Sequence, residues 1–395
     1  MLRYLTAGET HGKCLTVIIE GMPSGVKIDI DDINKMLSRR QQGYGRGGRM
    51  AIETDKAEIL SGVRGGYTLG SPIAIKIENK DWKNWEKIMN PGDCTKERCV
   101  TAPRPGHADL TGGMKYDHRD LRNVLERASA RETAARVAAG AVAMQLLKEF
   151  DIFAQTRCVS IGAVCDNADK LDDEFYKRAI SSPVGFGNAE SEKKAIEYIE
   201  NAKKSGESVG GIAETVFKNV PPGLGSYAQY DRKLDSLIAA AVVGIQAIKG
   251  VEIGIGFRAA KIPGSEVHDE IEYNNGKFSR KTNNAGGIEG GMSNGEPIEV
   301  RAAMKPIPTL YKPLSTVDIN TKETIKASVE RSDVCAVYAC SVVLESAVGF
   351  EIAKAFIDKF GGDSIGDIKA AYKNYLEKIK NYEFQILLVN DGSKD

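Results

Sequence analysis

Residues 125–143 read LERASARETAARVAAGAVA, and this stretch says most about the architecture of the chain. It lies within a segment, 121–150, that is rich in Ala, Arg, Glu and Leu and lacks proline, a composition that predicts one long helix. Alanine and valine recur on all sides of that helix. Because a helix that is apolar all round has no face suited to water, we expect most of it to be buried.

A second segment resembles the first. Residues 329–347 read VERSDVCAVYACSVVLESA and also run Glu-Arg, a small residue and then an apolar helix of small residues. Arg127 and Arg331 are 204 positions apart, about half of the 395-residue chain. This offset favours an internal duplication in which two equivalent helices pack centrally. The alternative is that shared composition alone produces the likeness.

The rest of the chain predicts further helices and short strands. Helices are expected at 31–40, 237–249 and 325–360, the last broken near Gly349, and strands at 15–19, 73–77, 211–216, 251–257 and 298–303. No Pro/Ser-rich linker or low-complexity tract separates the two halves. We therefore predict a single domain over residues 1–395 rather than two domains.

The overall composition excludes several classes of protein. Basic and acidic residues number 54 each, the formal net charge is zero, and 42% of residues are hydrophobic. A disordered chain and a globally basic nucleic-acid-binding protein are excluded, so no nucleic-acid partner is expected. The apolar runs 237–248 and 334–344 are shorter than the roughly 18–20 residues that a bilayer span needs, and the N-terminus shows no export pattern. We expect no membrane partner and a cytoplasmic location.

Cysteine and histidine patterns give no indication of a metal site. The seven cysteines form no CxxC pair, and the four histidines have no metal-ligand spacing. We expect reduced, structural thiols. Cys335 and Cys340 lie in an apolar run, where free cysteine behaves as a small hydrophobic residue, so both are predicted in the core.

Arginine is concentrated in the first third of the chain, where 13 of the 20 arginines lie before residue 137. The planar guanidinium matches phosphate and carboxylate and stays protonated. In a neutral protein this concentration suggests a concave site for a strongly anionic ligand. The alternative is that these arginines serve only to solubilise helices.

The loop GYGRGG, residues 43–48, satisfies the GxGxxG pattern of dinucleotide-binding folds. It follows the polar run Ser-Arg-Arg-Gln-Gln rather than a hydrophobic strand, which argues against that interpretation. What remains is a flexible, glycine-rich loop whose four arginines, 39, 40, 46 and 49, could close over an anion. The alternative is a solvated basic loop.

Two histidines and one carboxylate stand in unusual contexts. His11 lies beside a hydroxyl between glycines in GETHG, and His107 lies beside an arginine and a carboxylate in RPGHAD. Imidazole exchanges protons near neutral pH, so both are candidates for acid–base chemistry, the alternative being structural histidines. Asp333 is an acid among apolar neighbours and is either functional or the N-cap of the following helix.

Several ordered motifs resemble the chorismate synthase family. GETHG at 8–12, LERASARETAARVAAGA at 125–141 and RSDVCAVYACSVVLE at 331–345 carry the resemblance. RRQQGYGRGGRM, RPGHADLTG, GIQAIKGVEIG and NNAGGIEGGMSNGEPI are similar to the family in the same order, so the likeness spans nearly the whole chain. Tyr338 stands where a proline or small residue is expected, and Thr10 where serine is commoner.

This resemblance implies an activity and a fold. The family converts 5-enolpyruvylshikimate 3-phosphate to chorismate by an anti 1,4-elimination of phosphate, a lyase reaction of the shikimate pathway that leads to aromatic amino acids. It requires reduced FMN without net oxidation. The implied fold is an α+β, single-domain β-α-β sandwich, with central helices between two antiparallel sheets, usually assembled as a homotetramer.

The resemblance also implies roles in catalysis. His11 is similar to the family's acid for the departing phosphate, and His107 to the group that protonates reduced flavin or supports its anion. Asp333 would relay a proton from the flavin N5 position, with Thr10 and Ser129 as hydroxyl relays.

Two binding sets follow from the same resemblance. The residues expected to line the flavin are Arg127, Ala128, Ser129, Gln246, Ala247, Gly291, Lys305, Pro306, Ile307, Pro308, Thr309 and Arg331. The substrate carries a phosphate and two carboxylates, which cationic side chains would bind. The arginines expected there are Arg40, Arg46, Arg49, Arg104 and Arg131.

Two other functions and one open question remain. A pyridine-nucleotide-dependent flavin oxidoreductase would use GYGRGG for pyrophosphate, and an RNA-binding module would need aromatic residues beyond Tyr44 near the loop. The resemblance implies that reducing equivalents come ultimately from NADPH, whose phosphate Arg40 and Arg46 could also contact. Because no insertion is long enough for a reductase domain, we expect a separate flavin reductase.

Overall fold

The computed structural model describes residues 1–47, 54–92, 95, 97–168, 170–274, 276–328, 332–380 and 382. Its α-helices are α1 (Ile30–Gln41), α2 (Asp109–Tyr116), α3 (Arg122–Ala128), α4 (Thr133–Lys148), α5 (Asp173–Ser181), α6 (Ala189–Lys204), α7 (Leu234–Val243), α8 (Gly264–Val267), α9 (Val337–Phe360) and α10 (Ile365–Lys380). Short 3-10 helices include η3 (Ala130–Glu132) and η5 (Gly256–Lys261).

Two larger sheets are antiparallel throughout. The first has the order β1-β2-β6-β3, formed by β1 (Arg3–Ala7), β2 (Cys14–Glu20), β6 (Ile73–Glu78) and β3 (Ala57–Ile59). The second has the order β10-β15-β9-β7-β8, formed by β10 (Ile248–Ile253), β15 (Ile298–Met304), β9 (Gly211–Lys218), β7 (Phe153–Ile161) and β8 (Val164–Cys165).

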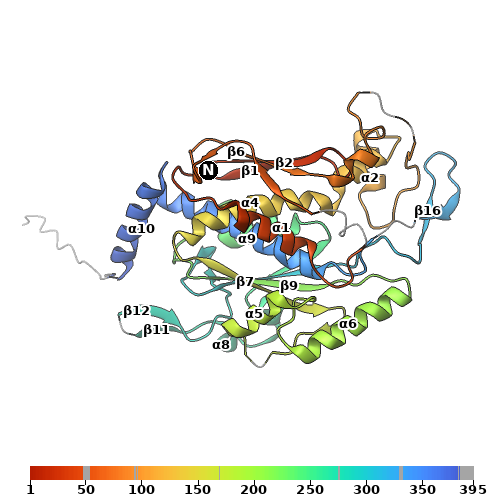
Figure 1. Cartoon of the computed structure of the whole chain (residues 1–395). Helices are drawn as coiled ribbons and strands as arrows, with labels where there is room; N and C mark the ends of the chain where they lie inside the picture. The colour runs from red at the N-terminus through yellow and green to blue at the C-terminus, as the bar shows by residue number, and fades with distance from the viewer. Residues whose placement is uncertain are drawn as a thin grey trace, which may run out of the picture.

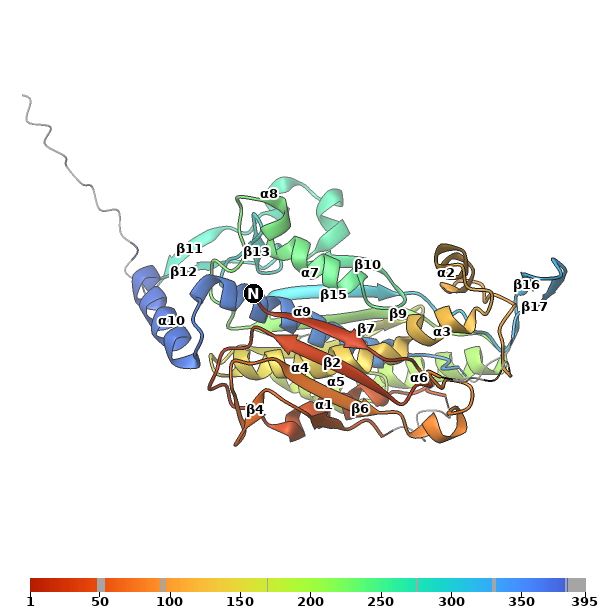
Figure 2. The same ribbon diagram turned by 90° about the horizontal axis from the view of Figure 1, so that it is seen from above.

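Four two-stranded sheets complete the fold. They pair β4 (Val63–Arg64) with β5 (Tyr67–Thr68), β11 (Ile271–Asn274) with β12 (Lys277–Arg280), β13 (Ile288–Glu289) with β14 (Met292–Ser293), and β16 (Ser315–Val317) with β17 (Thr324–Lys326). Figure 2 shows α10 at one end of the molecule and the β16–β17 hairpin at the other.

The two apolar helices predicted from the sequence pack against each other in the interior. α4 contacts β2 of the first sheet, α9 contacts β7 and β9 of the second, and the largest helix–helix contact is between α4 and α9. Figure 1 shows both helices between the two sheets. Thirteen of the 16 residues of α4 are buried, which confirms the expectation that alanine and valine on all its sides mark an interior helix.

A glycine allows this close packing. A Cβ atom on Gly140 of α4 would lie 2.5 Å from both the Cβ and the carbonyl oxygen of Ser346 on α9, distances that no real Cβ contact tolerates. On the same helix pair, a Cβ on Gly349 would meet Met144 Cγ at 2.9 Å and Phe217 Cζ at 3.0 Å. The backbones therefore approach to within a distance that only glycine permits.

Most predicted elements are confirmed, but the bounds of three helices and of one strand needed correction. The long helix expected over 121–150 is interrupted at Ser129, whose extended backbone (ψ 146°) separates α3 from η3 and whose Oγ accepts the Arg131 N–H at 3.3 Å. Serine competes for backbone hydrogen bonds in this way, and it caps a new helix instead of continuing the old one. The mixed helix-and-strand character is confirmed.

The other two corrections concern the later helices. α7 ends at Val243, and Ile248–Ile253 form β10 because pairing with β15 overrides the helical pattern. The helix expected from 325 begins only at Val337, after strand β17, and it continues through Gly349 without a break. Gly349 serves packing rather than helix termination. The strand expected over 251–257 ends at Ile253, where η5 follows after a short turn.

Among the helices of the described ranges, none combines the length and the apolar character that crossing a bilayer requires.

Replacing Gly140 with alanine tests the close helix contact. Alanine favours helices by about 1 kcal/mol over glycine, yet we expect Gly140→Ala to lower the free energy of unfolding by about 1–3 kcal/mol because the new methyl overpacks the contact with Ser346. The matched control is Gly366→Ala in exposed α10, where the nearest atom, Ser364 Oγ, is 3.6 Å away. Urea denaturation of both variants is the measurement. A Gly140→Ala protein as stable as the wild type would contradict the proposed constraint.

Candidate active site

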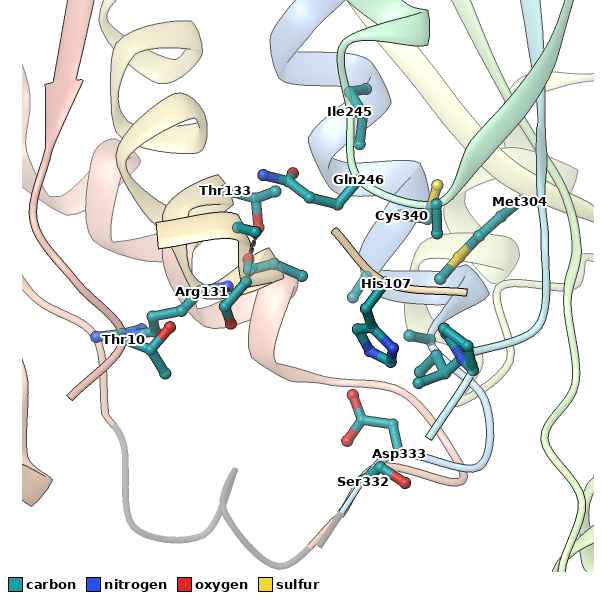
Figure 3. Close-up of a pocket in the computed structure, with 18 of the residues that line it drawn as sticks. Thr10, His107, Arg131, Thr133, Ile245, Gln246, Met304, Ser332, Asp333 and Cys340 are labelled. Carbon is teal, nitrogen blue, oxygen red and sulfur yellow. Dashed lines mark hydrogen bonds between the residues drawn. The ribbon is translucent and has the colours of Figure 1, made fainter. Parts of the chain in front are cut away.

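A cavity of about 440 Å³ opens where the N-terminal ends of α4 and α9 meet. Its walls come from the loop after β1, the end of α1, the 104–109 turn, the interruption between α3 and α4, residues 245–247, residues 304–308 and residues 332–343. Figure 3 shows Thr10 and Arg131 on one side of this space and His107 and Met304 on the other. Helix N-termini carry partial positive charge, so this position favours an anionic ligand.

Two buried arginines share one carboxylate at the base of the cavity. Arg131 Nη1 lies 2.6 and 2.7 Å from the two oxygens of Asp55, and Arg40 Nη1 lies 3.4 Å from Oδ2. Arg40 also donates to the Thr133 hydroxyl, and Arg131 Nε donates to Asn79. Burial lowers the pKa of Arg40 to about 10, partly offset by Asp55, so the guanidinium stays charged at neutral pH.

The 104–109 turn presents His107 to the cavity. Arg104 binds Asp109 through Nε at 2.8 Å and Nη2 at 3.1 Å, and Asp109 has no exposed surface. Burial would raise the pKa of Asp109, but the bonds and charge of Arg104 outweigh it, and the pKa is lowered. His107 Nδ1 lies 3.2 Å from the Pro105 carbonyl oxygen, and burial together with the charge of Arg104 lowers its pKa.

His11 is held by residues that the sequence did not single out. Its Nδ1 lies 2.8 and 3.0 Å from the two carboxylate oxygens of Glu126, and its ring stacks on Trp85 with centroids 3.7 Å apart. Glu126 belongs to α3, directly before the interruption at Ser129. The break in the predicted long helix places Ser129 in the cavity lining, and Glu126 lies behind His11, which lines the cavity.

The GYGRGG loop is packed, over its described residues, against the chain that leads into α9. Gly45 O accepts the N–H groups of Val334 and Cys335, and a Cβ on Gly45 would lie 2.9 Å from Ile199 Cγ2. The Gly47 N–H donates to Asp333 Oδ1 at 2.6 Å, and Arg46 Nε lies 3.3 Å from Oδ2. Residues 43–47 are therefore packed in this structure, and the flexibility expected of the loop stays a prediction. The loop follows helix α1, as the sequence indicated, and not a strand.

Two expectations about charged residues need correction. Arg39 does not face an anion site: it binds Glu345 through both terminal nitrogens, at 3.3 and 2.9 Å. Asp333 does not cap α9, because the helix begins at Val337 with Ala336 at the N-cap. Asp333 is instead oriented by the GYGRGG loop and faces the cavity (Figure 3).

The predicted core positions of Cys335 and Cys340 are confirmed, since both are buried.

The part of the cavity wall at residues 246 and 247 is mainly polar. Ala247 has a left-handed backbone (φ 70°), and its carbonyl oxygen accepts the Lys305 N–H. Gln246 Nε2 donates to Glu132 at 3.1 Å, whereas its buried Oε1 has no hydrogen-bond partner among the described residues. An oxygen in this state is suited to accept an N–H from a bound molecule.

Most predicted site residues line the same cavity. They are Thr10, His11, Arg40, Arg46, Arg104, His107, Ala128, Ser129, Arg131, Gln246, Ala247, Lys305, Ile307, Pro308 and Asp333. The structure brings them together from eight separate segments, which no local pattern could have shown.

A few predicted residues do not line the cavity. Arg127 donates to Thr6 and to the Gly8 carbonyl oxygen, Gly291 lies in the β13–β14 turn, and neither Pro306 nor Thr309 is in the lining. Thr309 contacts His107 Nε2 from outside the lining, at 3.4 Å. Arg49 and Arg331 lie outside the described residues, so the expectations for them stay predictions.

Sequence reasoning missed the partners of the catalytic candidates. Asp55, Asn79 and Trp85 lie outside the quoted motifs, and all of these partners, Glu126 included, are separated along the chain from the side chains that they hold. Glu126 could have been identified from the sequence, because it lies inside the LERASARETAARVAAGA motif. A buried glutamate beside an arginine-rich site is a general sign of a positioning role.

Comparisons with known proteins agree on one family. The family model described as chorismate synthase matches residues 2–357. The chain is 56% identical to the chorismate synthase of Moorella thermoacetica over 384 residues, covering 96% of this chain and 100% of the relative. It is 58% identical to that of Alkaliphilus metalliredigens over 377 residues, covering 95% and 99%. A crystal structure of chorismate synthase superposes with a TM-score of 0.79 at 43% identity, covering 96% of this chain and 99% of that one.

The lowered pKa of His107 predicts how stability depends on pH. The ordinary pKa of histidine is about 6.5, so as the pH falls through that value the unfolded chain takes up a proton at this residue before the folded protein does. His107 therefore costs stability on acidification. We expect His107→Gln to lose less free energy of unfolding than the wild type between pH 7.5 and 5.5, measured by urea denaturation. The control is His268→Gln, an exposed position, and equal losses in wild type and His107→Gln would contradict the assignment.

Proposed function

The chain belongs to the chorismate synthase family, and from that premise we propose that this cavity eliminates phosphate from 5-enolpyruvylshikimate 3-phosphate to form chorismate. The observation that carries the proposal is the meeting of four arginines and two histidines in one cavity at the N-termini of α4 and α9. The substrate has three anionic groups, and pre-placed cations stabilise charge without reorganising during the reaction. The anti 1,4 stereochemistry is part of the same proposal.

The arginines bind and orient the substrate. Arg40 and Arg131 are fixed by Asp55, Arg104 by Asp109, and Arg46 lies beside Asp333, so each enters the cavity in a set orientation. A guanidinium already held by a carboxylate loses little conformational entropy when an anion binds. His11 donates a proton from Nε2 to the departing phosphate. His107, whose lowered pKa favours the neutral ring, accepts or returns a proton at the other wall.

The residues around Gln246 fit reduced FMN. The unpartnered Oε1 of Gln246, the left-handed turn at Ala247 and the backbone at Ala128 and Ser129 form one wall, and Ile307 and Pro308 supply apolar surface. Lys305 lies on the same side and donates to the Gly106 carbonyl oxygen. When bound, reduced FMN supplies the electron density that assists the loss of phosphate. The volume of about 440 Å³ lies in the range of small-molecule sites.

Three further side chains are assigned to proton movement. Asp333 accepts from the Gly47 N–H at Oδ1, which leaves Oδ2 beside Arg46 at the cavity surface. The Thr10 hydroxyl donates to the Glu126 carbonyl oxygen, and the Ser129 hydroxyl accepts the Arg131 N–H. The Ser129 hydroxyl hydrogen is not used in that bond, so it can be donated to a ligand in the cavity.

The wider expectations complete the proposal. We keep the β-α-β sandwich as one domain over residues 1–395, with the duplication that relates α4 to α9. We also keep the homotetramer, the cytoplasmic location and the separate flavin reductase that takes reducing equivalents from NADPH. Incubation with FMN and NADPH, with and without an added reductase, distinguishes an enzyme that reduces its own flavin from one that does not.

The first test of the activity is its stoichiometry. Substrate and product are at the same oxidation level, so we expect chorismate formation to require reduced FMN but not to consume it. The measurement is the amount of flavin oxidised per chorismate formed under anaerobic conditions. One flavin oxidised per product would refute the elimination and favour the alternative, a pyridine-nucleotide-dependent flavin oxidoreductase.

The second test concerns the two cavity histidines. We expect His11→Ala and His107→Ala to fold and bind FMN but to lose about 10²–10⁴-fold in kcat, the usual contribution of a general acid or base. His268→Ala removes an exposed imidazole outside the cavity and serves as the matched control. Normal turnover at saturating substrate in either cavity variant would show that its histidine has no acid–base role.

A further inference from the structure

Glu126 is buried and contacts Thr10 and His11 through both its carboxylate and its backbone carbonyl oxygen. Its carboxylate has no exposed surface. Oε1 lies 2.8 Å from His11 Nδ1, Oε2 lies 3.0 Å from the same nitrogen, and Oε2 also accepts the His11 backbone N–H at 2.8 Å. The Glu126 carbonyl oxygen accepts both the backbone N–H and the hydroxyl of Thr10. One residue of α3 therefore holds Thr10 and His11 at five points.

We propose that Glu126 is the positioning residue of His11: its carboxylate keeps the hydrogen on Nδ1 and so leaves Nε2 as the nitrogen that exchanges a proton with the ligand. The role of that proton rests on the proposed function, whereas the position of the hydrogen on the ring does not.

The chemistry of the contact determines the tautomer. An ionised carboxylate only accepts hydrogen bonds, so a nitrogen within 2.8 Å of it must carry the hydrogen. Burial would raise the pKa of Glu126, but the hydrogen bonds and charge of His11 and the charge of Arg122 outweigh it and lower the pKa. The carboxylate is thus ionised at neutral pH. Arg122 Nη1 contacts Oε1 at 3.2 Å.

The orientation of the ring is fixed as well. His11 stacks on Trp85 with an interplanar angle of 18°, and Trp85 Nε1 donates to Asp81 Oδ2 at 2.9 Å. The guanidinium carbons of Arg98 and Arg122 lie 4.3 and 5.1 Å from the Trp85 ring centroid. Rotating the His11 ring by half a turn would break the hydrogen bond between Nδ1 and the Glu126 carboxylate. Nδ1 would then be left without this partner.

This arrangement suits a proton donor to a departing anion. The imidazolium form carries a hydrogen on each nitrogen, and Glu126 neutralises its charge while Nε2 donates to a phosphate oxygen. The electron pair of the N–H bond stays on Nε2, the proton forms the new O–H bond, and the ring ends as the Nδ1–H tautomer that Glu126 already favours. Because the ring starts and ends with the same hydrogen bond to Glu126, no rearrangement accompanies the transfer.

Nuclear magnetic resonance of the wild-type protein tests the tautomer directly. The chain has four histidines, so ¹⁵N-histidine labelling gives four imidazoles, and comparison with His11→Gln assigns His11. We expect the neutral ring of His11 to show a protonated Nδ1 and an unprotonated Nε2. A neutral ring with its hydrogen on Nε2, or an equal mixture of tautomers, would overturn the proposal. This measurement needs no variant of Glu126 and no turnover.

The variant Glu126→Gln tests the functional consequence. The glutamine side chain has a single oxygen, which cannot accept hydrogen bonds from the His11 backbone N–H, the His11 Nδ1–H and Arg122 together. Its N–H₂ group would face one of these donors, and two donors cannot form a hydrogen bond. We expect a smaller Nδ1–H population and a loss of about 10²-fold in kcat, with KM much less affected. Glu345→Gln, a buried glutamate that binds Arg39 as Glu126 binds Arg122, is the matched control and should keep the wild-type His11 spectrum.

The outcomes separate this proposal from the proposed function. An unchanged His11 tautomer and unchanged kcat in folded Glu126→Gln would overturn the positioning role. A wild-type protein that forms no chorismate would refute the activity and leave the tautomer result to stand. If Glu126→Gln does not fold, the wild-type spectrum alone supports or overturns the placement of the hydrogen.

Discussion

The close contact between α4 and α9 is the constraint on which the rest of the structure depends. It requires a glycine at position 140, because a Cβ there would lie 2.5 Å from Ser346. With the helices this close, α4 packs against β2 on one side and α9 against β7 and β9 on the other (Figure 1). The N-terminal ends of both helices then reach one cavity, so packing in the core and the electrostatics of the site have the same origin.

The positive charges of the cavity arginines are compensated by nearby carboxylates. Buried guanidinium groups are costly unless carboxylates accompany them, and here Asp55, Asp109 and Asp333 lie beside the arginines of the cavity. The three carboxylates offset three of the four guanidinium charges, so the arginines can be buried and the group keeps a net positive charge. This pairing also holds each guanidinium in place before a ligand arrives, and placement of charge in advance is what makes an electrostatic site effective in catalysis.

The two histidines illustrate how far sequence context reaches. Both were identified from their neighbours in GETHG and RPGHAD, and both line the cavity. Part of the surroundings of His107 is local, since Arg104, Pro105 and Asp109 lie within three residues of it, whereas Thr309, which contacts Nε2, is 202 positions away. Those of His11 are not: Glu126 is 115 positions away, and Trp85 comes from an irregular connection. Sequence motifs therefore pointed to the two histidines that line the cavity, but not to the distant residues that contact them.

Composition and periodicity by themselves determined the buried central helices, most strands, the reduced thiols of the core and, through ordered motifs, the family. These are properties of short stretches, where burial and propensity act on neighbouring residues. Only the tertiary structure decided where the long helix stops at Ser129, that β10 replaces the end of an apolar helix, and that Arg39 binds Glu345. The break at Ser129 involves a hydrogen bond to the Arg131 N–H two residues away, whereas the other two depend on a partner distant in the sequence. A hydrogen bond, a strand pairing or an ion pair across the fold can outweigh a local preference of a few tenths of a kcal/mol per residue, and no local pattern carries the position of that partner.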